Sequence, residues 1–178
     1  MNVKIHHIKV STKIGSFCIQ LNAKEAPHTC EYFQNIIHNN KLEEGTIFRV
    51  LTAQNQTSEP RIHALQMGSH NALSEFRSHI LHEHTKMTGL AHRKWSVSAA
   101  RYAPGELYQS FFICMRDEPC LDFQGERHPD KQGFACFGEI VSGYDVIEKL
   151  YTQAGQQEIL NPPIKIESFH LTDSINKK

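Results

Sequence analysis

Apolar and polar residues alternate along most of this chain with a period of two, the pattern of β-strands with one buried face. The segments 3–11 and 16–21 alternate in this way, and Gly15 between them breaks the phase as a hairpin turn does. Other segments with strand character are 46–51, 61–68, 95–101, 110–115, 133–141 and 164–172. The pattern therefore predicts a protein built mostly from short strands.

Two segments change to the period of an α-helix. Between residues 26 and 40, Phe33, Ile36 and Ile37 share one face, and a proline stands at the expected first turn. The segment 145–151 likewise places its apolar residues on one face. Many strands, two widely separated helices and long connecting loops favour an antiparallel barrel or sandwich whose ends are closed by the helices.

Composition and charge narrow the classes of function. A chain of 178 residues is expected to form one domain, spanning residues 1–178. Its 19 Lys and Arg balance its 19 Asp and Glu, which argues against a basic face for nucleic acid. No run approaches the roughly 18 apolar residues of a membrane span, so no membrane partner is expected. Nothing in the sequence indicates an obligate oligomer, and we expect a monomer.

The cysteines and the first residues of the chain predict a cytoplasmic location. The five cysteines are odd in number and include no C-x-x-C pair, which is typical of free thiols in a reducing compartment. The opening segment, MNVKIHHIKVSTK, lacks the apolar core of a signal peptide. Cys114 lies in a hydrophobic segment, where burial is expected to raise the pKa of its thiol.

The segment 70–94 is polar, irregular and rich in histidine, which raises the question of a metal site. His79, His82 and His84 lie close together, as zinc-binding histidines often do. However, Lys86 stands four residues after His82, and no cysteine is near. We therefore expect a solvated loop without a metal, with metal-linked regulation as the weaker alternative. The chain also lacks G-x-S-x-G and a glycine-rich phosphate loop, which disfavours a hydrolase or nucleotide enzyme.

Several motifs, in a fixed order, carry a resemblance to a known family. They are GSFCIQLNAKEAPHTCEYFQNII, GTIFRV, LQMG, VSAARYAPGELYQSFFIC, LDFQG and GFACFGEIVSGYDVIEKL. Together they resemble the cyclophilin family of peptidyl-prolyl cis-trans isomerases, from about Val3 to about Asp173. The resemblance implies a mainly β fold: a closed eight-stranded antiparallel barrel capped by two α-helices, with the active site in a groove on its outer wall.

The resemblance also implies roles for particular residues. Considered without the resemblance, Arg49 would be interpreted as an outward-facing cation in an apolar strand. In the resemblance it matches the catalytic arginine, and Gln66 matches the glutamine that holds this arginine. Phe112 and Leu121 match the floor and wall of a pocket for a proline ring, while the adjacent Phe111 fills the barrel. The other positions expected to contact substrate are Phe48, His63, Ala64, Ala100, Arg101, Ser110, Cys120 and Phe134.

The chemistry that the resemblance implies needs no base, metal or cofactor. Rotation about an X-Pro bond is slow because it breaks amide resonance. A donor to the prolyl nitrogen stabilises the twisted state, in which conjugation is lost, and arginine suits this role because it stays charged and rigid. The expected function is isomerisation of X-Pro bonds in proline-containing peptides and in unfolded or partly folded proteins, which assists folding.

The sequence departs from the family pattern at several positions. Ser110 stands where glutamine is usual and Cys120 where the best-known members have tryptophan, while Met67 and Trp95 replace common glycines. The segment LTAQNQTSEPRI is longer than the family's connection, and His63 and Ala64 follow it where the family has pocket phenylalanine and methionine. These departures motivate the alternative that the protein is a binding module for proline-containing segments, with weak isomerase activity or none.

Overall fold

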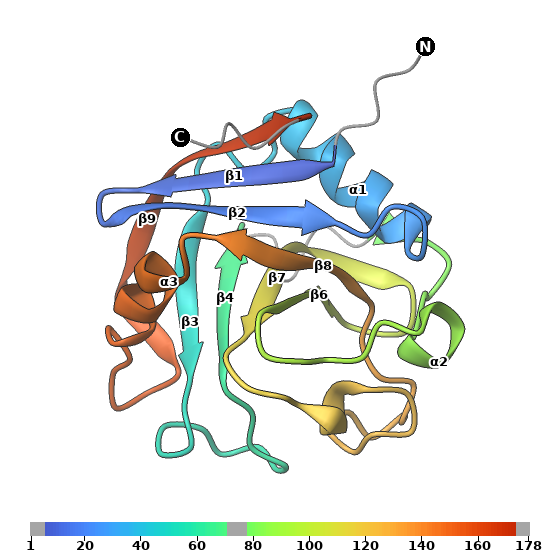
Figure 1. Ribbon diagram of the computed structural model, residues 1–178. Helices are drawn as coiled ribbons and strands as arrows, with labels where there is room; N and C mark the ends of the chain where they lie inside the picture. The colour runs from blue at the N-terminus through green and yellow to red at the C-terminus, as the bar shows by residue number, and fades with distance from the viewer. Residues whose placement is uncertain (1–5, 71–77, 174–178) are drawn as a thin grey trace.

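A single closed sheet organises the computed structural model, which describes residues 6–70 and 78–173 (Figure 1). Its strands are β1 (His7–Thr12), β2 (Gly15–Leu21), β3 (Thr46–Leu51), β4 (Ala64–Gly68), β5 (Ser78–His79), β6 (Ser96–Arg101), β7 (Glu106–Cys114), β8 (Cys136–Ser142) and β9 (Ile159–Thr172). The helices are α1 (Pro27–His38), α2 (Thr85–Thr88) and α3 (Tyr144–Tyr151), with a short 3₁₀ helix at Pro119–Leu121.

The strands close into the predicted eight-stranded antiparallel barrel. Hydrogen-bonded neighbours follow the order β4, β3, β9, β1, β2, β8, β6 and β7, and β7 then pairs back with β4. The two-residue strand β5 adds to β7 without entering the ring. Because closure leaves no free edge in this ring, the strands present one inward and one outward face around the whole circuit.

The barrel interior is the main apolar core. Phe111, Phe137 and Ile19 are fully buried in it. The α1 residue Phe33 closes this core, stacking on Phe137 at 4.5 Å and meeting the edge of Phe111 at 5.5 Å between ring centroids. The helix α3 packs at the other end of β2, where Val146 lies against the turn at Gly15 (Figure 1). The two helices thus cover the barrel as the sequence predicts.

A buried carboxylate holds the start of α1 in place. Its N-cap, Ala26, has no side chain that could accept from the first amides of the helix. Glu83, which is 2% exposed, accepts instead from the amide of His28 at 3.1 Å and from the amide and hydroxyl of Thr29 at 2.9 and 2.7 Å. The histidine-rich segment is therefore tied to the barrel's cap through the residue between His82 and His84.

Several element boundaries differ from the sequence prediction. The segment expected to be irregular contains β5 and a third helix, α2, of one turn. β4 begins at Ala64 and not at residue 61, whereas β7 and β9 begin at Glu106 and Ile159, earlier than expected. β9 extends because its pairing with β3 resumes after an irregularity, a long-range contact that local alternation does not reveal. Residues 3–5 of the first predicted strand lie outside the described residues.

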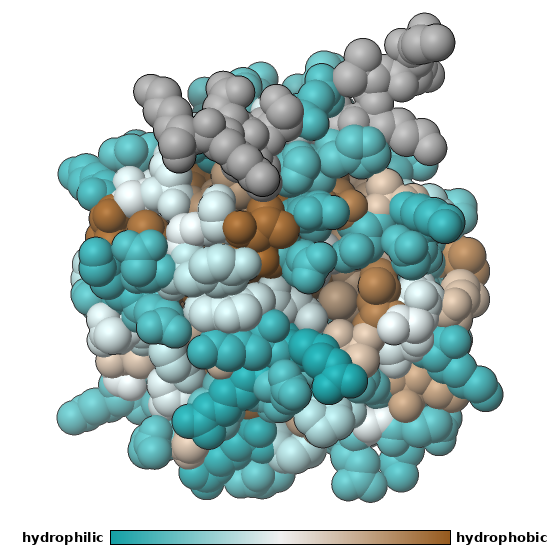
Figure 2. Space-filling view, viewed as in Figure 1, coloured by the Kyte–Doolittle hydropathy of each residue, from teal (hydrophilic) through white to brown (hydrophobic). Residues whose placement is uncertain are grey.

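The outer surface is mostly polar. On the face shown in Figure 2, hydrophilic side chains predominate and apolar ones form small separate groups. Within the described residues, no helix has the length and apolar character needed to cross a membrane.

Candidate functional site

The two adjacent phenylalanines of β7 face opposite sides of the barrel wall. Phe111 is fully buried in the barrel core, whereas Phe112 belongs to a second apolar cluster on the outside. This outer cluster consists of Leu51, Ile62, Ala64, Ala100, Phe112, Cys114 and Leu121, with Tyr108, Cys120 and Phe134 packed against it. The opposite orientation follows from strand alternation, and it gives the outer wall an apolar floor.

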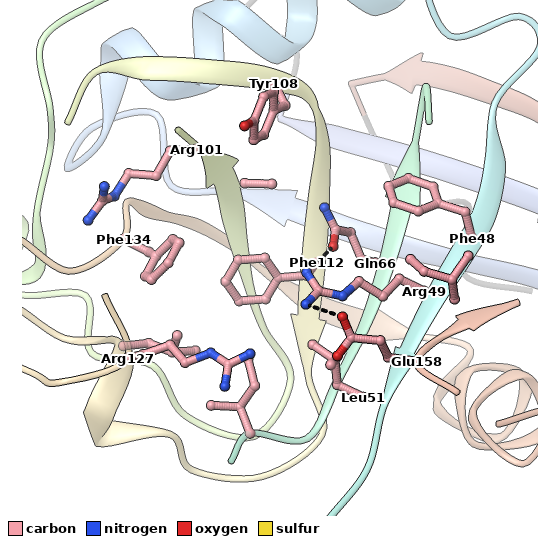
Figure 3. Close-up of a pocket in the computed structure, with 14 residues that line it drawn as sticks. Phe48, Arg49, Leu51, Gln66, Arg101, Tyr108, Phe112, Arg127, Phe134 and Glu158 are labelled. Carbon is pink, nitrogen blue, oxygen red and sulfur yellow. Dashed lines mark hydrogen bonds and ion pairs between the residues drawn. The ribbon is translucent and has the colours of Figure 1, made fainter. Parts of the chain in front are cut away.

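A pocket of about 420 Å³ lies over this outer cluster. That volume is within the usual range of small-molecule sites, roughly 300–1,000 Å³. Its lining, drawn in Figure 3, consists of Phe48, Arg49, Leu51, Ile62, Gln66, Ala100, Arg101, Tyr108, Phe112, Leu121, Arg127, Phe134, Glu158 and Ile159. The pocket therefore combines an apolar floor with a rim that carries three arginines and one glutamate.

A β-bulge in β3 directs Arg49 to this pocket. Ile47 pairs with Met67 and Arg49 pairs with Gln66, so that Phe48 is the extra residue between them. Ile47 is fully buried in the barrel, and the bulge lets both of the following residues reach the outer side. Bulges commonly redirect side chains beside active sites.

Two side chains hold the guanidinium of Arg49 at the pocket. Its Nη1 donates to Oε1 of Gln66 at 3.3 Å, and its Nη2 donates to Oε1 of Glu158 at 2.8 Å (Figure 3). Gln66 in turn donates through Nε2 to Oγ of Ser110 at 3.1 Å. The Nε of Arg49 is buried and has no hydrogen-bond partner among the described residues. The guanidinium is thus oriented from two sides, and each Nη atom retains a second N–H that neither of these hydrogen bonds uses.

A polar triad, of which His92 and Ser98 are buried and Asp122 is partly exposed, backs the floor of the pocket. The His92 ring lies nearly parallel to Phe112 at 6.4 Å between centroids. Its Nδ1 lies 2.7 Å from Oδ1 of Asp122 and its Nε2 lies 2.8 Å from Oγ of Ser98. Burial alone would raise the pKa of Asp122, but the hydrogen bonds from the ring and amide of His92 outweigh it and lower that pKa. The triad fixes the ring behind Phe112 and so stiffens the floor.

The other two arginines of the rim are held by different partners. Arg101 binds both carboxylate oxygens of Asp130 at 2.8 Å, and its guanidinium lies 4.8 Å from the centroid of the Phe134 ring. Burial alone would raise the pKa of Asp130, but the hydrogen bonds from Arg101 and from the amide of Gln132, with the charge of Arg101, together lower it to about 2. Phe134 meets the edge of Phe112 at 5.8 Å. Among the described residues, the hydrogen bonds of the Arg127 guanidinium all go to neutral oxygens, those of Gln56, Ser58 and Pro60.

Most of the site residues predicted from the sequence line this pocket. They are Phe48, Arg49, Gln66, Ala100, Arg101, Phe112, Leu121 and Phe134. They come from β3, β4, β6, β7, the 3₁₀ helix and the segment before β8, which only the closed barrel brings together.

His63 and Ala64 lie outside the lining, contrary to the sequence prediction. The amide of His63 donates to Oε1 of Glu118 at 2.7 Å and its Nδ1 lies 3.1 Å from the same atom. Ala64 is buried within the outer cluster. Ile62 lines the pocket instead, because the amide group of Gln56 pairs with its backbone N–H and C=O. The pocket is consequently apolar where the sequence suggested a polar side chain.

Ser110 and Cys120 also lie outside the lining. Ser110 is fully buried. Its hydroxyl oxygen accepts a hydrogen bond from the side-chain amide of Gln66 and so helps to position Gln66. Cys120 packs against the outer cluster from behind, and burial, followed by the charge of Glu118, raises the pKa of its thiol. Burial also raises the pKa of the Cys114 thiol, as the sequence indicated.

Six lining residues were not predicted: Leu51, Ile62, Tyr108, Arg127, Glu158 and Ile159. Leu51 continues the outer face of β3, which an alternation argument that included the bulge could have found. Glu158 and Ile159 precede the segment where alternation placed the last strand. Arg127 lies in a loop, where no periodic pattern applies.

The histidines of the histidine-rich segment pack against residues that are distant in the sequence. His82 Nε2 lies 3.0 Å from the carbonyl of Gln132, and burial is the main cause that lowers the pKa of His82. His84 accepts from the amide of Met87 at 3.3 Å and stacks on Phe123 at 4.4 Å. Within residues 6–70 and 78–173, no group of three or more metal-ligating side chains occurs.

Comparison with known proteins identifies relatives of this site and fold. Residues 7–171 match the family model described as cyclophilin type peptidyl-prolyl cis-trans isomerase/CLD. The peptidyl-prolyl cis-trans isomerase cyp18 of Streptomyces antibioticus is 26% identical over 168 residues, which cover 90% of this chain and 95% of that protein. These similarities extend over the whole barrel and include the segments that build the pocket.

Solved structures show the same fold. A cyclophilin type peptidyl-prolyl cis-trans isomerase of Cryptosporidium parvum superposes with a TM-score of 0.74 at 16% identity, covering 95% of this chain and 98% of that one. A second structure of that protein, in the presence of the dipeptide Ala-Pro, superposes with a TM-score of 0.72 at 16% identity, covering 93% and 98%.

Proposed function

Because the chain belongs to the family of cyclophilin-type peptidyl-prolyl cis-trans isomerases, we propose that Arg49 is the group through which it accelerates rotation about X-Pro bonds. The observation that carries this proposal is the guanidinium of Arg49, oriented by Gln66 and Glu158 on the rim of an apolar pocket. Phe112, together with the rest of the apolar floor, supplies the surface on which a proline ring packs.

The pocket accelerates the reaction by binding the twisted amide better than the planar one. The barrier to rotation is about 18–20 kcal/mol because planarity preserves conjugation between nitrogen and carbonyl. A hydrogen bond from Arg49 to the prolyl nitrogen forms only when the nitrogen has become pyramidal, so it stabilises the transition state selectively. If the site contributes about 4–7 kcal/mol in this way, rotation accelerates by about 10³–10⁵-fold.

The substrates proposed are proline-containing peptide segments bound in extended form. The strand β6 pairs with β7 as far as Arg101, but among the described residues it pairs with β8 only at Ser96, Val97 and Ser98, so the β8 side of Ala100 and Arg101 has no recorded strand partner. An extended peptide can hydrogen-bond to such an edge without regard to its side chains. The Cryptosporidium parvum relative has been crystallised in the presence of Ala-Pro, which supports the same class of ligand here.

The wider setting of the activity is also a proposal. Unfolded or partly folded proteins expose X-Pro bonds that equilibrate in about 10–100 s without catalysis, and they are the clients that we propose. We propose that the protein acts as a monomer in the cytoplasm, without binding nucleic acid or membranes. All five cysteines are free thiols, which suits a reducing compartment.

The test compares the wild type with Arg49→Ala and with Arg93→Ala, which removes an arginine whose side chain is 74% exposed and lies outside the pocket. Exchange NMR on an Ala-Ala-Pro-Phe peptide measures cis–trans rates without a coupling protease. We expect acceleration by the wild type and by Arg93→Ala, and its loss in a folded Arg49→Ala. Equal rates in all three proteins would remove the role of Arg49. Peptide binding without acceleration by the wild type would instead favour the binding-module alternative.

A further inference from the structure

Arg127 brings a second cation into the pocket from the loop that follows the 3₁₀ helix. In Figure 3, Arg127 and Arg49 extend toward the pocket from opposite sides, with Phe112 between them. The mechanism proposed for X-Pro rotation uses Arg49 and the apolar floor and assigns nothing to Arg127. Its position on the rim therefore calls for a separate function.

The charges of the three rim arginines are compensated unequally. Arg49 is paired with Glu158 at 2.8 Å, and Arg101 is paired with Asp130 through two contacts of 2.8 Å. Arg127 forms no ion pair with a carboxylate in the part of the chain that the structure describes. Among the three rim arginines, Arg127 is thus the one whose charge is not neutralised by direct contact with a carboxylate of the described residues.

Neutral oxygens hold the Arg127 side chain in place. Its Nη1 donates to the carbonyl of Pro60 at 2.9 Å, to the carbonyl of Ser58 at 3.2 Å and to Oε1 of Gln56 at 3.2 Å. Its Nε and Nη2 make no hydrogen bond to the described residues, and neither atom is buried away from solvent. One nitrogen therefore anchors the guanidinium while two remain able to donate to a ligand.

Arg127 and Arg49 line the same pocket, so two cations face one space. Burial lowers the pKa of Arg127 and the positive charge of Arg49 lowers it further, whereas the more distant carboxylates Glu158 and Glu118 act in the opposite sense. Burial alone would disfavour any charged ligand, but two guanidinium groups that face one pocket favour the approach of an anion. A carboxylate gains both Coulomb attraction and charge-assisted hydrogen bonds from a fixed guanidinium.

We propose that Arg127 is a specificity-determining residue that selects substrates carrying an acidic side chain, Asp or Glu, next to the proline. The inference rests on the proposed function, because it assumes that the proline ring lies on the floor formed by Phe112. A peptide extended across the pocket then places the side chains that flank the proline near the rim. Opposite charges across such a rim tune which partner binds and how fast.

The experiment uses peptides of one length in which Glu or its neutral isostere Gln stands directly before or directly after the proline. Exchange NMR gives the isomerisation rate for each peptide, and chemical-shift titration gives its Kd independently of turnover. The quantity compared is the Glu-to-Gln ratio within each protein, which is unaffected by a general loss of activity. The proteins are the wild type, Arg127→Gln, Arg127→Lys and the matched control Arg93→Gln, which removes one exposed arginine outside the pocket.

We expect the wild type to favour Glu over Gln at one or both positions by roughly two- to fivefold, the scale of a partly exposed ion pair. The ratio should fall to about one in Arg127→Gln, survive in Arg127→Lys and Arg93→Gln, and shrink as salt is raised. A ratio of one in the wild type, or a ratio unchanged in Arg127→Gln, would overturn the inference. If the wild type accelerates no peptide, the proposed isomerase function is wrong. The Glu-to-Gln ratio of the Kd values then still tests whether Arg127 selects acidic peptides.

Discussion

Glu158 accepts a hydrogen bond from Nη2 of Arg49 at 2.8 Å, so the guanidinium at the proline pocket carries an anionic partner from its own chain. The two side chains are 27% and 29% exposed, which places their contact at the boundary between protein and solvent. Glu158 directly precedes β9, whereas Arg49 lies at the bulge of β3. The contact therefore depends on the pairing of these two strands, and it both orients and partly neutralises the cation that we propose acts on the prolyl nitrogen.

Replacing Glu158 with Gln separates these two effects. The substitution keeps a side-chain oxygen that accepts from Nη2 but removes the negative charge. We expect the rate of X-Pro exchange to rise about two- to fivefold, because Arg49 then presents a less neutralised charge to the prolyl nitrogen, a change on the scale of a partly exposed ion pair. Glu158→Ala removes the acceptor as well and should be slower than Glu158→Gln. Exchange NMR checks both rates, and a Gln variant as slow as the Ala variant would show that the carboxylate is needed for orientation.

The two phenylalanines of β7 provide a test that separates stability from activity. Phe111→Ala leaves a cavity in the closed barrel and should lower the free energy of unfolding by about 3–5 kcal/mol. Phe112→Ala opens onto the pocket and should cost about 1.5–3 kcal/mol. The effect on catalysis should be reversed: Phe112→Ala loses the floor for the ring and about tenfold or more in kcat/KM, equivalent to about 1.4 kcal/mol. Urea unfolding and exchange NMR measure the two quantities, and equal losses of activity in both folded variants would contradict this assignment.

The pair of Arg101 and Asp130 should make the fold's stability depend on pH in acid. The pKa of Asp130 is lowered from 3.8 to about 2, since burial, which would raise it, is outweighed by the hydrogen bonds from Arg101 and the amide of Gln132 together with the charge of Arg101. A carboxyl group whose pKa is lower in the folded than in the unfolded state stabilises the fold fully at pH values above its unfolded pKa of 3.8. This stabilisation is lost as the pH falls from 3.8 toward about 2. Asp130→Asn should therefore be less stable than wild type at pH 6, with the difference shrinking below pH 4. Urea unfolding across this range checks it.

The control for this experiment is Glu126→Gln. Glu126 is 74% exposed and lies 3.6 Å from Lys131, an exposed contact that contributes little to stability. Its removal should change the free energy of unfolding only slightly at each pH. If Asp130→Asn behaved in the same way at pH 6, the ion pair with Arg101 would have no role in stability.

Local alternation predicts an antiparallel barrel or sandwich, and the resemblance to the family then indicates the closed barrel and the centre of the pocket. Alternation separates Phe111 from Phe112, and the family motifs contain Arg49, Gln66 and Leu121. The residues that were missed reach the pocket through long-range contacts. Ile62 lines the pocket in place of the expected His63 because the side chain of Gln56 binds the backbone of Ile62. Both residues precede β4, so strand alternation does not decide which of them faces the pocket.

The charged residues at the rim of the pocket could not be predicted from the sequence for the same reason. Glu158 and Arg127 look like ordinary surface charges in the sequence, and only the pairing of β9 with β3 and the folding of two loops bring them to the pocket. Motifs therefore identify the chemistry shared by the family, whereas the charges that adjust it in this chain depend on the tertiary structure.

Trp95, which stands where the family commonly has glycine, has a backbone conformation that explains the preference for glycine. Its φ is 76°, in the left-handed region where a Cβ costs about 1–2 kcal/mol. The indole offsets part of this cost by packing against the edge of Tyr144 at 5.0 Å and beneath the ammonium of Lys94 at 4.7 Å. The position thus combines backbone strain with side-chain contacts that a glycine would not make.

Comparing Trp95→Gly with Trp95→Ala isolates the backbone term, because both variants lose the same ring contacts. Alanine keeps the Cβ in a left-handed conformation, whereas glycine adopts it freely. We therefore expect Trp95→Gly to be more stable than Trp95→Ala by about 1–2 kcal/mol, the reverse of the usual order in a strand or helix. Urea unfolding of both variants measures the difference. An alanine variant as stable as the glycine variant would mean that the backbone relaxes out of the left-handed region once the indole is gone, and that the ring contacts are what hold Trp95 in it.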